Sequence, residues 1–204
     1  VKQGRDADKI LVCPNAIDPR QFVPDGLVAS RPENVCEENT VVGFVGSFLP
    51  YHGLDLLVDV ARELRDEYPE LRWLLVGDGV EKPRVEKKIA DNGMKERFWL
   101  PGKVPHEDVP SYVRAMDIAV LPHAADFNSP MKLFEYMGLA RPVIAPASPA
   151  IQEVIDDGRT GMLFERGSQE SLRGTIETLA ADGDIRNKLG QRARESVLEN
   201  HTWE

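Results

Sequence analysis

VVGFVGSFLPYHGLDLLVDVA, residues 41–61, decides the fold of this 204-residue chain. Its first five residues are β-branched or aromatic apart from one glycine, and they predict a buried strand. After the loop GSFLPYHG (46–53), apolar residues recur at the spacing of one helical face: Leu54, Leu57, Val58, Ala61 and Leu64. The stretch is therefore predicted to be a strand–loop–helix unit.

The same alternation of short apolar runs and amphipathic stretches continues along the chain. Further strands are predicted at 73–77, 98–102, 117–122, 142–146 and 161–164. Helices are predicted at 80–92, 107–116, from about 130, 150–156, 168–182 and 185–200. Six strands alternating with helices predict an α/β fold: a doubly wound, six-stranded parallel sheet with helices on both faces. Its strand order is expected to be 3-2-1-4-5-6.

The sequence predicts one Rossmann-like domain over residues 41–204. Residues 1–40 are predicted to be an arm or linker with a short strand, because they contain four prolines and several acidic residues. Cys13 and Cys36 are the only cysteines and belong to no metal-binding pattern, so neither a zinc site nor a disulfide framework is expected. No apolar run approaches the roughly 20 residues that a membrane span needs.

The net charge of -9 excludes a general affinity for nucleic acid or an anionic membrane. A phosphorylated ligand would therefore need a local positive site. In a doubly wound sheet, ligands bind beyond the carboxyl ends of the strands, where the strand order reverses. Loops 46–53 and 123–130 are expected to meet at that point.

The second of these loops leads into a predicted helix with the features of a nucleotide site. Ser129 is a suitable N-cap and Pro130 suits the first helical position, so the free amides of the helix would face an anion. Lys132 adds a positive charge for phosphate, and Glu135 shares its helix face. A carboxylate at Glu135 could accept hydrogen bonds from both hydroxyls of a ribose. The alternative is a surface ion pair between Lys132 and Glu135 on an ordinary helix.

Two other patterns are assigned structural roles. The Asp-x-Asp sequences DAD (6–8) and DGD (182–184) resemble metal-binding pairs, but their positions favour helix capping and solubility. No GxGxxG opens a helix after the first strand, which disfavours NAD and FAD. His106 is expected in a turn at a helix start.

Several motifs in order resemble the C-terminal, donor-binding domain of retaining GT-B glycosyltransferases of the glycosyl transferase group 1, or family 4, type. Beside residues 41–61, the matching stretches are VCPNAIDPRQFVP (12–24), LLVGDG (74–79), DIAVLP (117–122), SPMKLFEYMGLARPVIA (129–145) and EVIDDGRTGMLF (153–164). The resemblance covers nearly the whole chain. It implies that an acceptor-binding N-terminal domain lies outside this sequence.

The resemblance assigns the catalytic positions to Lys132, on the diphosphate, and Glu135, on the ribose as the second glutamate of a Glu-x7-Glu motif. Gly46 would let the chain approach the phosphates, and Val104 in the segment 101–104 would pack against the base. The remaining expected donor contacts are Ser47, His52, His123, Asp126, Phe127, Asn128, Ser129, Met131 and Leu133.

Three positions depart from the family pattern. Phe127 stands where the first glutamate of the motif is expected, and Asp126 or Asn128 could contact the sugar instead. Ser47 and His52 stand where many relatives have Arg and Lys. Lys132 is then the main formal charge expected on the diphosphate, and His52 is either a further donor or a structural residue.

The resemblance implies a hexosyltransferase that uses a nucleoside diphosphate sugar, with UDP-sugar favoured, in polysaccharide or glycoconjugate synthesis. It implies no metal or other cofactor. The implied partners are the N-terminal domain and an acceptor glycan or lipid-linked sugar, with no nucleic acid. The expected location is the cytoplasm, including peripheral contact with the inner face of the membrane. The alternatives are a non-catalytic nucleotide-binding or regulatory domain and a UDP-sugar epimerase-like enzyme.

Overall fold

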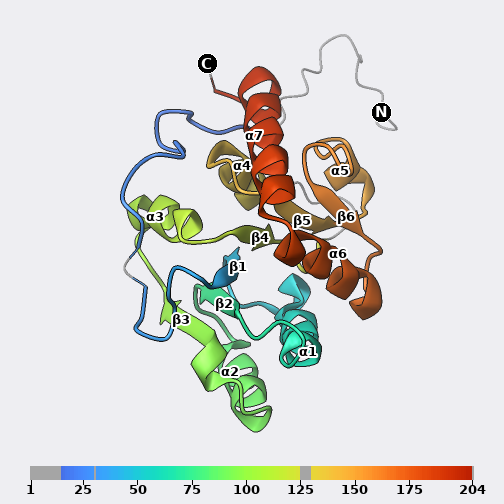
Figure 1. The fold of residues 1–204 in the computed structure, drawn as a ribbon. Coiled ribbons are helices and arrows are strands. Elements are labelled where there is room, and N and C mark those ends of the chain that lie inside the picture. The colour runs from blue at the N-terminus through green and yellow to red at the C-terminus, as the bar shows by residue number, and fades with distance from the viewer. Residues whose placement is uncertain (1–14, 30, 125–129, 204) are drawn as a thin grey trace, which may run out of the picture.

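A computed structural model describes residues 15–29, 31–124 and 130–203. Six parallel strands form one sheet in the order β3-β2-β1-β4-β5-β6 (Figure 1). The strands are β1 (Thr40–Val45), β2 (Leu71–Val76), β3 (Phe98–Gly102), β4 (Ile118–Val120), β5 (Val143–Pro146) and β6 (Met162–Phe164). The predicted doubly wound topology is confirmed, and the strand order reverses between β1 and β4.

The helices also follow the predicted alternation, with shorter bounds in places. They are α1 (Leu54–Leu64), α2 (Lys82–Asp91), α3 (Val109–Arg114), α4 (Met131–Gly138), α5 (Pro149–Gln152), α6 (Gln169–Ala181) and α7 (Gly183–Asn200). The helix predicted at 107–116 is shorter because the 3-10 turn η4 (His106–Asp108) precedes it, which confirms the turn expected at His106. The helix predicted at 150–156 ends at Gln152.

Two hydrophobic clusters cover the two faces of the sheet. Val42 and Phe44 of β1 belong to the cluster that contains apolar residues of α1, α2 and α6. Val41 belongs to the other cluster, with residues of α3 and α4. Helix α7 contributes Leu189 to the first cluster and Val197 to the second, so it passes from one face to the other (Figure 1). The alternation of side chains along β1 therefore fixes its position in the core.

Asp182 separates α6 from α7 and caps the second helix. Its Oδ1 atom accepts hydrogen bonds from the backbone N–H groups of Asp184, at 2.9 Å, and Ile185, at 3.0 Å. The interpretation of DGD (182–184) as a cap is confirmed, whereas DAD (6–8) lies outside the described residues. The bounds of the two terminal helices lie within two residues of the predicted ranges, 168–182 and 185–200.

Replacing Asp182 with Ala is expected to lower the free energy of unfolding by about 1 kcal/mol, because two amides at the start of α7 lose their acceptor. Urea unfolding followed by circular dichroism measures the change. Asp182→Asn is the matched control, because Asn is an equally good N-cap. An equal loss of stability in both variants would contradict a capping role.

Backbone carbonyl groups of the described part of the arm, residues 15–29 and 31–40, accept hydrogen bonds from side chains of the domain. Arg114 of α3 donates from Nε to the Val23 carbonyl and from Nη1 to the Leu27 carbonyl, both at 3.0 Å. Arg194 of α7 donates to the Phe22 carbonyl at 2.9 Å. Ile17 forms a parallel bridge with Thr202. The first 14 residues, which include Cys13, lie outside the described residues.

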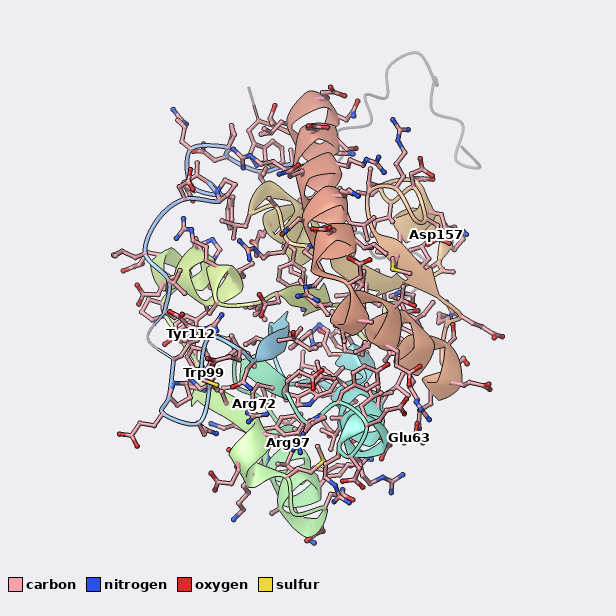
Figure 2. The ribbon with its side chains drawn as sticks, viewed as in Figure 1. Glu63, Arg72, Arg97, Trp99, Tyr112 and Asp157 are labelled. Atoms are coloured by element: carbon pink, nitrogen blue, oxygen red, sulfur yellow. The ribbon has the colours of Figure 1, made fainter. Side chains whose placement is uncertain are left out.

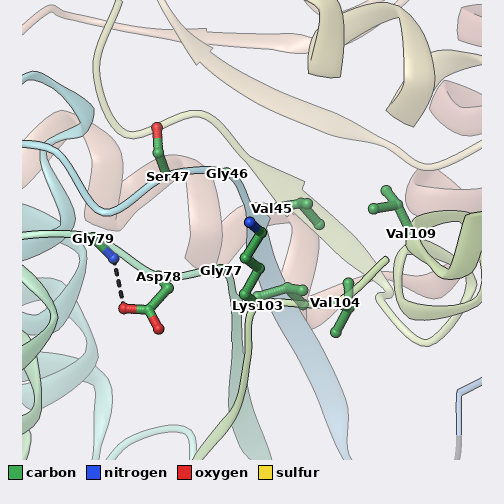
Figure 3. Close-up of a pocket in the computed structure, with 10 residues that line it drawn as sticks. Val45, Gly46, Ser47, Gly77, Asp78, Gly79, Lys103, Val104 and Val109 are labelled. Carbon is green, nitrogen blue, oxygen red and sulfur yellow. Dashed lines mark hydrogen bonds between the residues drawn. The ribbon is translucent and has the colours of Figure 1, made fainter. Parts of the chain in front are cut away.

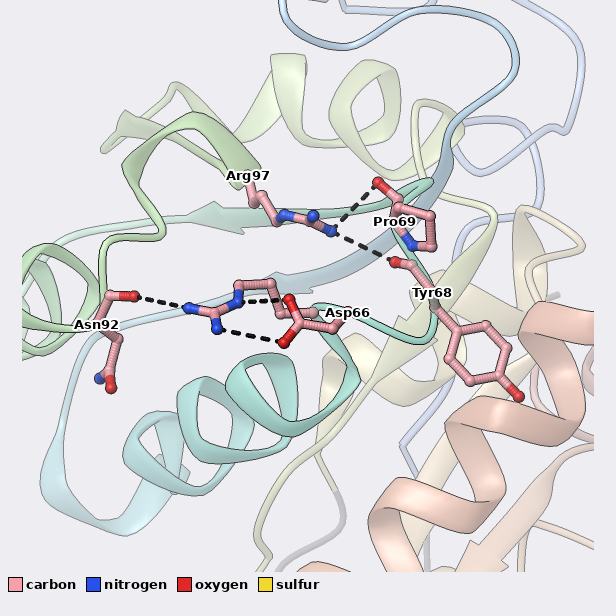
Figure 4. A network of polar contacts seen from close by, with 6 residues as sticks. Asp66, Tyr68, Pro69, Asn92 and Arg97 are labelled. Atoms are coloured by element: carbon pink, nitrogen blue, oxygen red, sulfur yellow. Dashed lines mark hydrogen bonds and ion pairs between the residues drawn. The ribbon is translucent and has the colours of Figure 1, made fainter.

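Arginine side chains also organise the loops at the amino ends of the strands. Arg97, just before β3, donates to the carbonyls of Tyr68, at 3.4 Å, and Pro69, at 3.2 Å, while Arg65 pairs with Asp66 (Figure 4). Arg72 and Arg97 are labelled in Figure 2, together with Trp99 of β3 and Tyr112 of α3, whose rings pack 5.7 Å apart. These contacts leave the carboxyl ends of the strands open for a site.

Candidate functional site

Two adjoining clefts lie at the carboxyl ends of the strands. The larger has a volume of about 580 Å³, and its walls include Val76, Gly77, Asp78, Gly79, Lys103 and Val104 (Figure 3). The smaller has a volume of about 340 Å³, and its walls include Tyr51, His52, His106, Pro130, Met131, Lys132 and Glu135. Both are also lined by Val45, Gly46, Ser47 and Val109. The turn after β1 is therefore the ridge between them.

Glycine is required where the loops after β1 and β2 meet. Gly46 and Gly77 have φ values of 154° and 137°, a region that side-chain-bearing residues rarely adopt. The Gly46 amide donates to the Val76 carbonyl at 3.0 Å, and a Cβ atom on Gly77 would collide with the Gly46 carbonyl. A Cβ atom on Gly46 would collide with the Lys132 ammonium. Its protein neighbours thus require glycine at position 46, and the close approach of this turn to the donor phosphates stays a prediction.

Lys132 projects from the first turn of α4 into the space beside Gly46. Its Nζ lies 3.4 Å from His52 Nε2 and 4.3 Å from the centroid of the Phe44 ring. Burial lowers the pKa of Lys132 from 10.5 to about 8, and the negative charge of Glu135 partly opposes that shift. A phosphate in the cleft would place a further negative charge beside this half-buried ammonium.

His52 links the turn after β1 to Lys132. Its Nδ1 contacts the Ser47 carbonyl, and burial together with the nearby Lys132 charge lowers the pKa of the imidazole. The neutral ring fits both contacts when Nδ1–H donates to the Ser47 carbonyl and Nε2 accepts from the Lys132 ammonium. His52 therefore helps to position the Lys132 ammonium. From the sequence, His52 could have been either a residue that contacts the sugar donor or a structural residue.

Glu135 lies one turn along α4 and lines the same cleft. Burial raises the pKa of its carboxyl group, and the charges of His106 and Lys132 oppose that rise. Both Glu135 and Lys132 are half-buried, so the alternative of an exposed surface ion pair does not fit. A half-buried carboxylate to which no described residue donates a hydrogen bond is suited to accept hydrogen bonds from ligand hydroxyl groups.

The start of α4 differs by one residue from the prediction. Pro130 occupies the N-cap position and Met131 begins the helix, while the predicted N-cap Ser129 lies outside the described residues. Leu133 is a correction: its side chain is fully buried in the core, and its amide donates to the Pro130 carbonyl at 3.0 Å. The side chain and the amide of Leu133 therefore both have partners within the protein, so neither is directed at a donor. Its apolar spacing along the helix, which is typical of a core residue, is a better guide to its role than its position in the motif.

The other predicted site residues fall into three groups. Gly46, Ser47, His52, Val104 and Met131 line the clefts with Lys132 and Glu135. His123 stands behind the loop, where its Nδ1 lies 2.7 Å from the Tyr51 carbonyl. The expected sugar contacts lie outside the described residues: Asp126, Phe127 and Asn128.

Sequence reasoning missed four cleft residues with polar side chains: Tyr51, Asp78, Lys103 and His106. Lys103 directly precedes Val104 after β3, so its place in the predicted base loop was the available signal. In Figure 3 its side chain extends from the end of β3 towards the Gly46 turn. Lys103 has no hydrogen bond or ion pair within the described part of the chain. Asp78 instead contacts the Gly79 amide at 2.7 Å and Lys82 at 3.7 Å.

The structure is a doubly wound α/β domain with two adjoining clefts at the switch point of its sheet. Residues 29–196 match the family model of glycosyl transferases group 1, and the chain belongs to this family. Similar curated relatives include the alpha-D-kanosaminyltransferase of Streptomyces kanamyceticus, 25% identical over 77% of this chain. Another is the D-inositol 3-phosphate glycosyltransferase of Geodermatophilus obscurus, 31% identical over 89% of the chain.

Solved structures share the fold. The C-terminal domain of the group 1 protein LpcC from Francisella tularensis matches with a TM-score of 0.78 and 21% identity, over 92% of this chain and 100% of that domain. Anabaena HepE, solved in complex with UDP-glucose, matches with a TM-score of 0.81 and 20% identity, over 98% of this chain and 55% of that protein. The match to an isolated C-terminal domain confirms the predicted GT-B half.

The chain spans 40% and 42% of the lengths of the two curated relatives named above. Every helix within the described residues is too short or too polar to cross a bilayer. The described residues also contain no group of three or more His, Cys, Asp or Glu side chains placed to bind a metal ion. The expectation of metal-independent chemistry stays a prediction.

Proposed function

We propose that this domain binds a nucleoside diphosphate sugar, with UDP-sugar favoured, as the donor for retaining glycosyl transfer. One observation carries the proposal: Lys132 and Glu135 lie one helical turn apart on the wall of a cleft that is bordered by the glycine turn after β1. An ammonium beside a close-approach glycine suits a diphosphate, and a carboxylate one turn away suits the attached ribose. Val104 supplies an apolar surface for the base in the adjoining cleft.

The chemistry assigned to these residues is electrostatic. Retaining transfer releases a nucleoside diphosphate while positive charge develops at the anomeric carbon of the sugar. The ammonium of Lys132 and the amides at the start of α4 would stabilise the charge on the leaving diphosphate. The attacking hydroxyl would come from an acceptor, glycan or lipid-linked, held by a separate N-terminal domain. This division predicts that the 204-residue chain binds the donor without transferring its sugar.

Lys103 is expected to contribute a second positive charge. A diphosphate carries more negative charge than Lys132 alone can neutralise, and the lowered pKa of His52 leaves that ring neutral near pH 7. Lys103→Met is therefore expected to weaken UDP binding about three- to tenfold, with a smaller dependence of affinity on salt. Lys188→Met, which removes an exposed charge on α7, is the matched control. Equal affinities of the two variants would contradict a role for Lys103.

Isothermal titration calorimetry with UDP, GDP, UDP-glucose and GDP-mannose tests the proposed function. We expect saturable binding of the UDP compounds, weaker binding of the GDP compounds, and no transfer to acceptors by the chain alone. Binding of GDP in preference to UDP would change the assigned base and leave the site in place. Failure of all four ligands to bind would overturn the donor site and favour a non-catalytic domain.

A further inference from the structure

Tyr136 joins helix α4 to the end of strand β1. Its side chain is fully buried, and its hydroxyl oxygen accepts a hydrogen bond from the Val45 amide at 2.8 Å. The hydroxyl also lies 3.4 Å from the Val45 carbonyl, to which it donates. Burial raises the pKa of the phenol, so the group stays a neutral hydroxyl able to make both contacts.

The Val45 amide needs this partner because the neighbouring strand has ended. Pairing between β1 and β4 extends to Gly43 and Ala119, and β4 ends at Val120. The next amide, on Gly46, points to the other side and donates to Val76 of β2. Successive amides of a strand face opposite neighbours, so Val45 faces the side that β4 has left. Tyr136 therefore supplies the acceptor that a longer strand would have provided.

The position of this contact connects the two halves of the proposed donor site. Val45 directly precedes Gly46, whose turn forms the ridge between the clefts. On the other side, Tyr136 directly follows Glu135 and lies four residues after Lys132, one helical turn away. One buried hydrogen bond thus sets the distance from the phosphate-facing turn to the helix that carries both charged groups.

We propose that Tyr136 is a positioning residue, whose hydroxyl holds the Gly46 turn at the spacing from α4 that a diphosphate requires. The proposal rests on the proposed function, because the spacing matters only for a ligand that contacts both elements. Phosphates would bridge the turn and Lys132, whereas the base and ribose would contact Val104 and Glu135. Loss of the hydroxyl should therefore affect phosphate recognition more than nucleoside recognition.

Tyr136→Phe tests this role with UDP and uridine as paired probes. We expect the affinity for UDP to fall about tenfold, because the unsatisfied Val45 amide lets the turn move, while the affinity for uridine changes less than about twofold. Hydrogen exchange of the ligand-free protein should be faster at residues 45–47 and unchanged in α7. The UDP-to-uridine ratio is the readout that a merely structural role would leave constant.

Two variants control for general effects. Tyr112→Phe removes a hydroxyl from a half-buried tyrosine of α3, and Val197→Ala destabilises the core cluster to which Tyr136 belongs without removing its hydroxyl. Both are expected to keep the wild-type UDP-to-uridine ratio. If Tyr136→Phe also keeps it while the wild type binds UDP, the positioning role is overturned and the donor site stands. If the wild type binds no UDP, the donor site is overturned, and the role of Tyr136 with it.

Discussion

Replacing Glu135 with Ala is expected to weaken UDP binding at least about 30-fold. Glu135 is half-buried on the wall of the smaller cleft, where the nearby charges of His106 and Lys132 favour its ionised form. Two hydrogen bonds from ribose hydroxyls to an ionised carboxylate are together worth about 2–3 kcal/mol, because charged acceptors form the stronger bonds. Removing the carboxylate removes both.

Calorimetry with UDP and 2′-deoxy-UDP on the wild type and Glu135→Ala measures this effect. The wild type should discriminate against the deoxy ligand, and the variant should bind both ligands almost equally. Glu107→Ala, which removes an exposed carboxylate from the adjacent 3-10 turn η4, should behave as the wild type. Undiminished discrimination by Glu135→Ala would show that another group holds the ribose.

Lys132→Met is expected to weaken UDP binding about 30-fold while leaving uridine binding nearly unchanged. The ammonium contacts His52 and the Phe44 ring, and burial lowers its pKa while the charge of Glu135 opposes that shift. A partly desolvated ammonium interacts with a phosphate more strongly than an exposed one does. An equal loss for both ligands would place Lys132 outside the phosphate subsite.

The same side chain predicts a pH dependence of donor binding. The pKa of Lys132 is lowered to about 8 in the protein alone, and the negative charge of a bound diphosphate would raise it. The complex then holds a proton that the free protein has lost, so affinity falls as the pH rises above about 8. A UDP-sugar is the appropriate ligand, since its phosphate groups do not titrate in this range. Lys132→Arg should remove the dependence, because guanidinium stays charged.

The sheet, and the placement of Gly46 and Lys132 at one edge of it, were predictable because both follow from local patterns. Strand periodicity and helical spacing placed β1 and α1, and the rule for switch points placed Gly46 and Lys132 at one edge. The helix limits were less predictable, because hydrogen bonds decide whether residues 106–108 form a 3-10 turn or part of α3. The one-residue shift at Pro130 has the same origin.

Contacts between distant side chains were beyond the sequence pattern. Tyr136 lies on the buried face of α4, and no sequence pattern indicates that its hydroxyl bonds to Val45, 91 residues away in sequence. His52 shows the same limit, since its contact with Lys132 spans 80 residues. Lys103 stands in an expected loop, but only the folded chain shows that its side chain lines the larger cleft.

The partial burial of the Lys132 ammonium against Phe44 also lowers the stability of the folded protein at pH values where the lysine is charged. An unfolded chain keeps the lysine protonated up to its ordinary pKa of 10.5, whereas the folded chain releases that proton near 8. Between these two pH values, unfolding is accompanied by protonation of Lys132. The contribution of this side chain to the free energy of unfolding therefore rises as the pH increases over that range. As the pH rises above about 8, the stability of the fold is therefore expected to increase while the affinity for the donor decreases, and both effects arise from the same ammonium group.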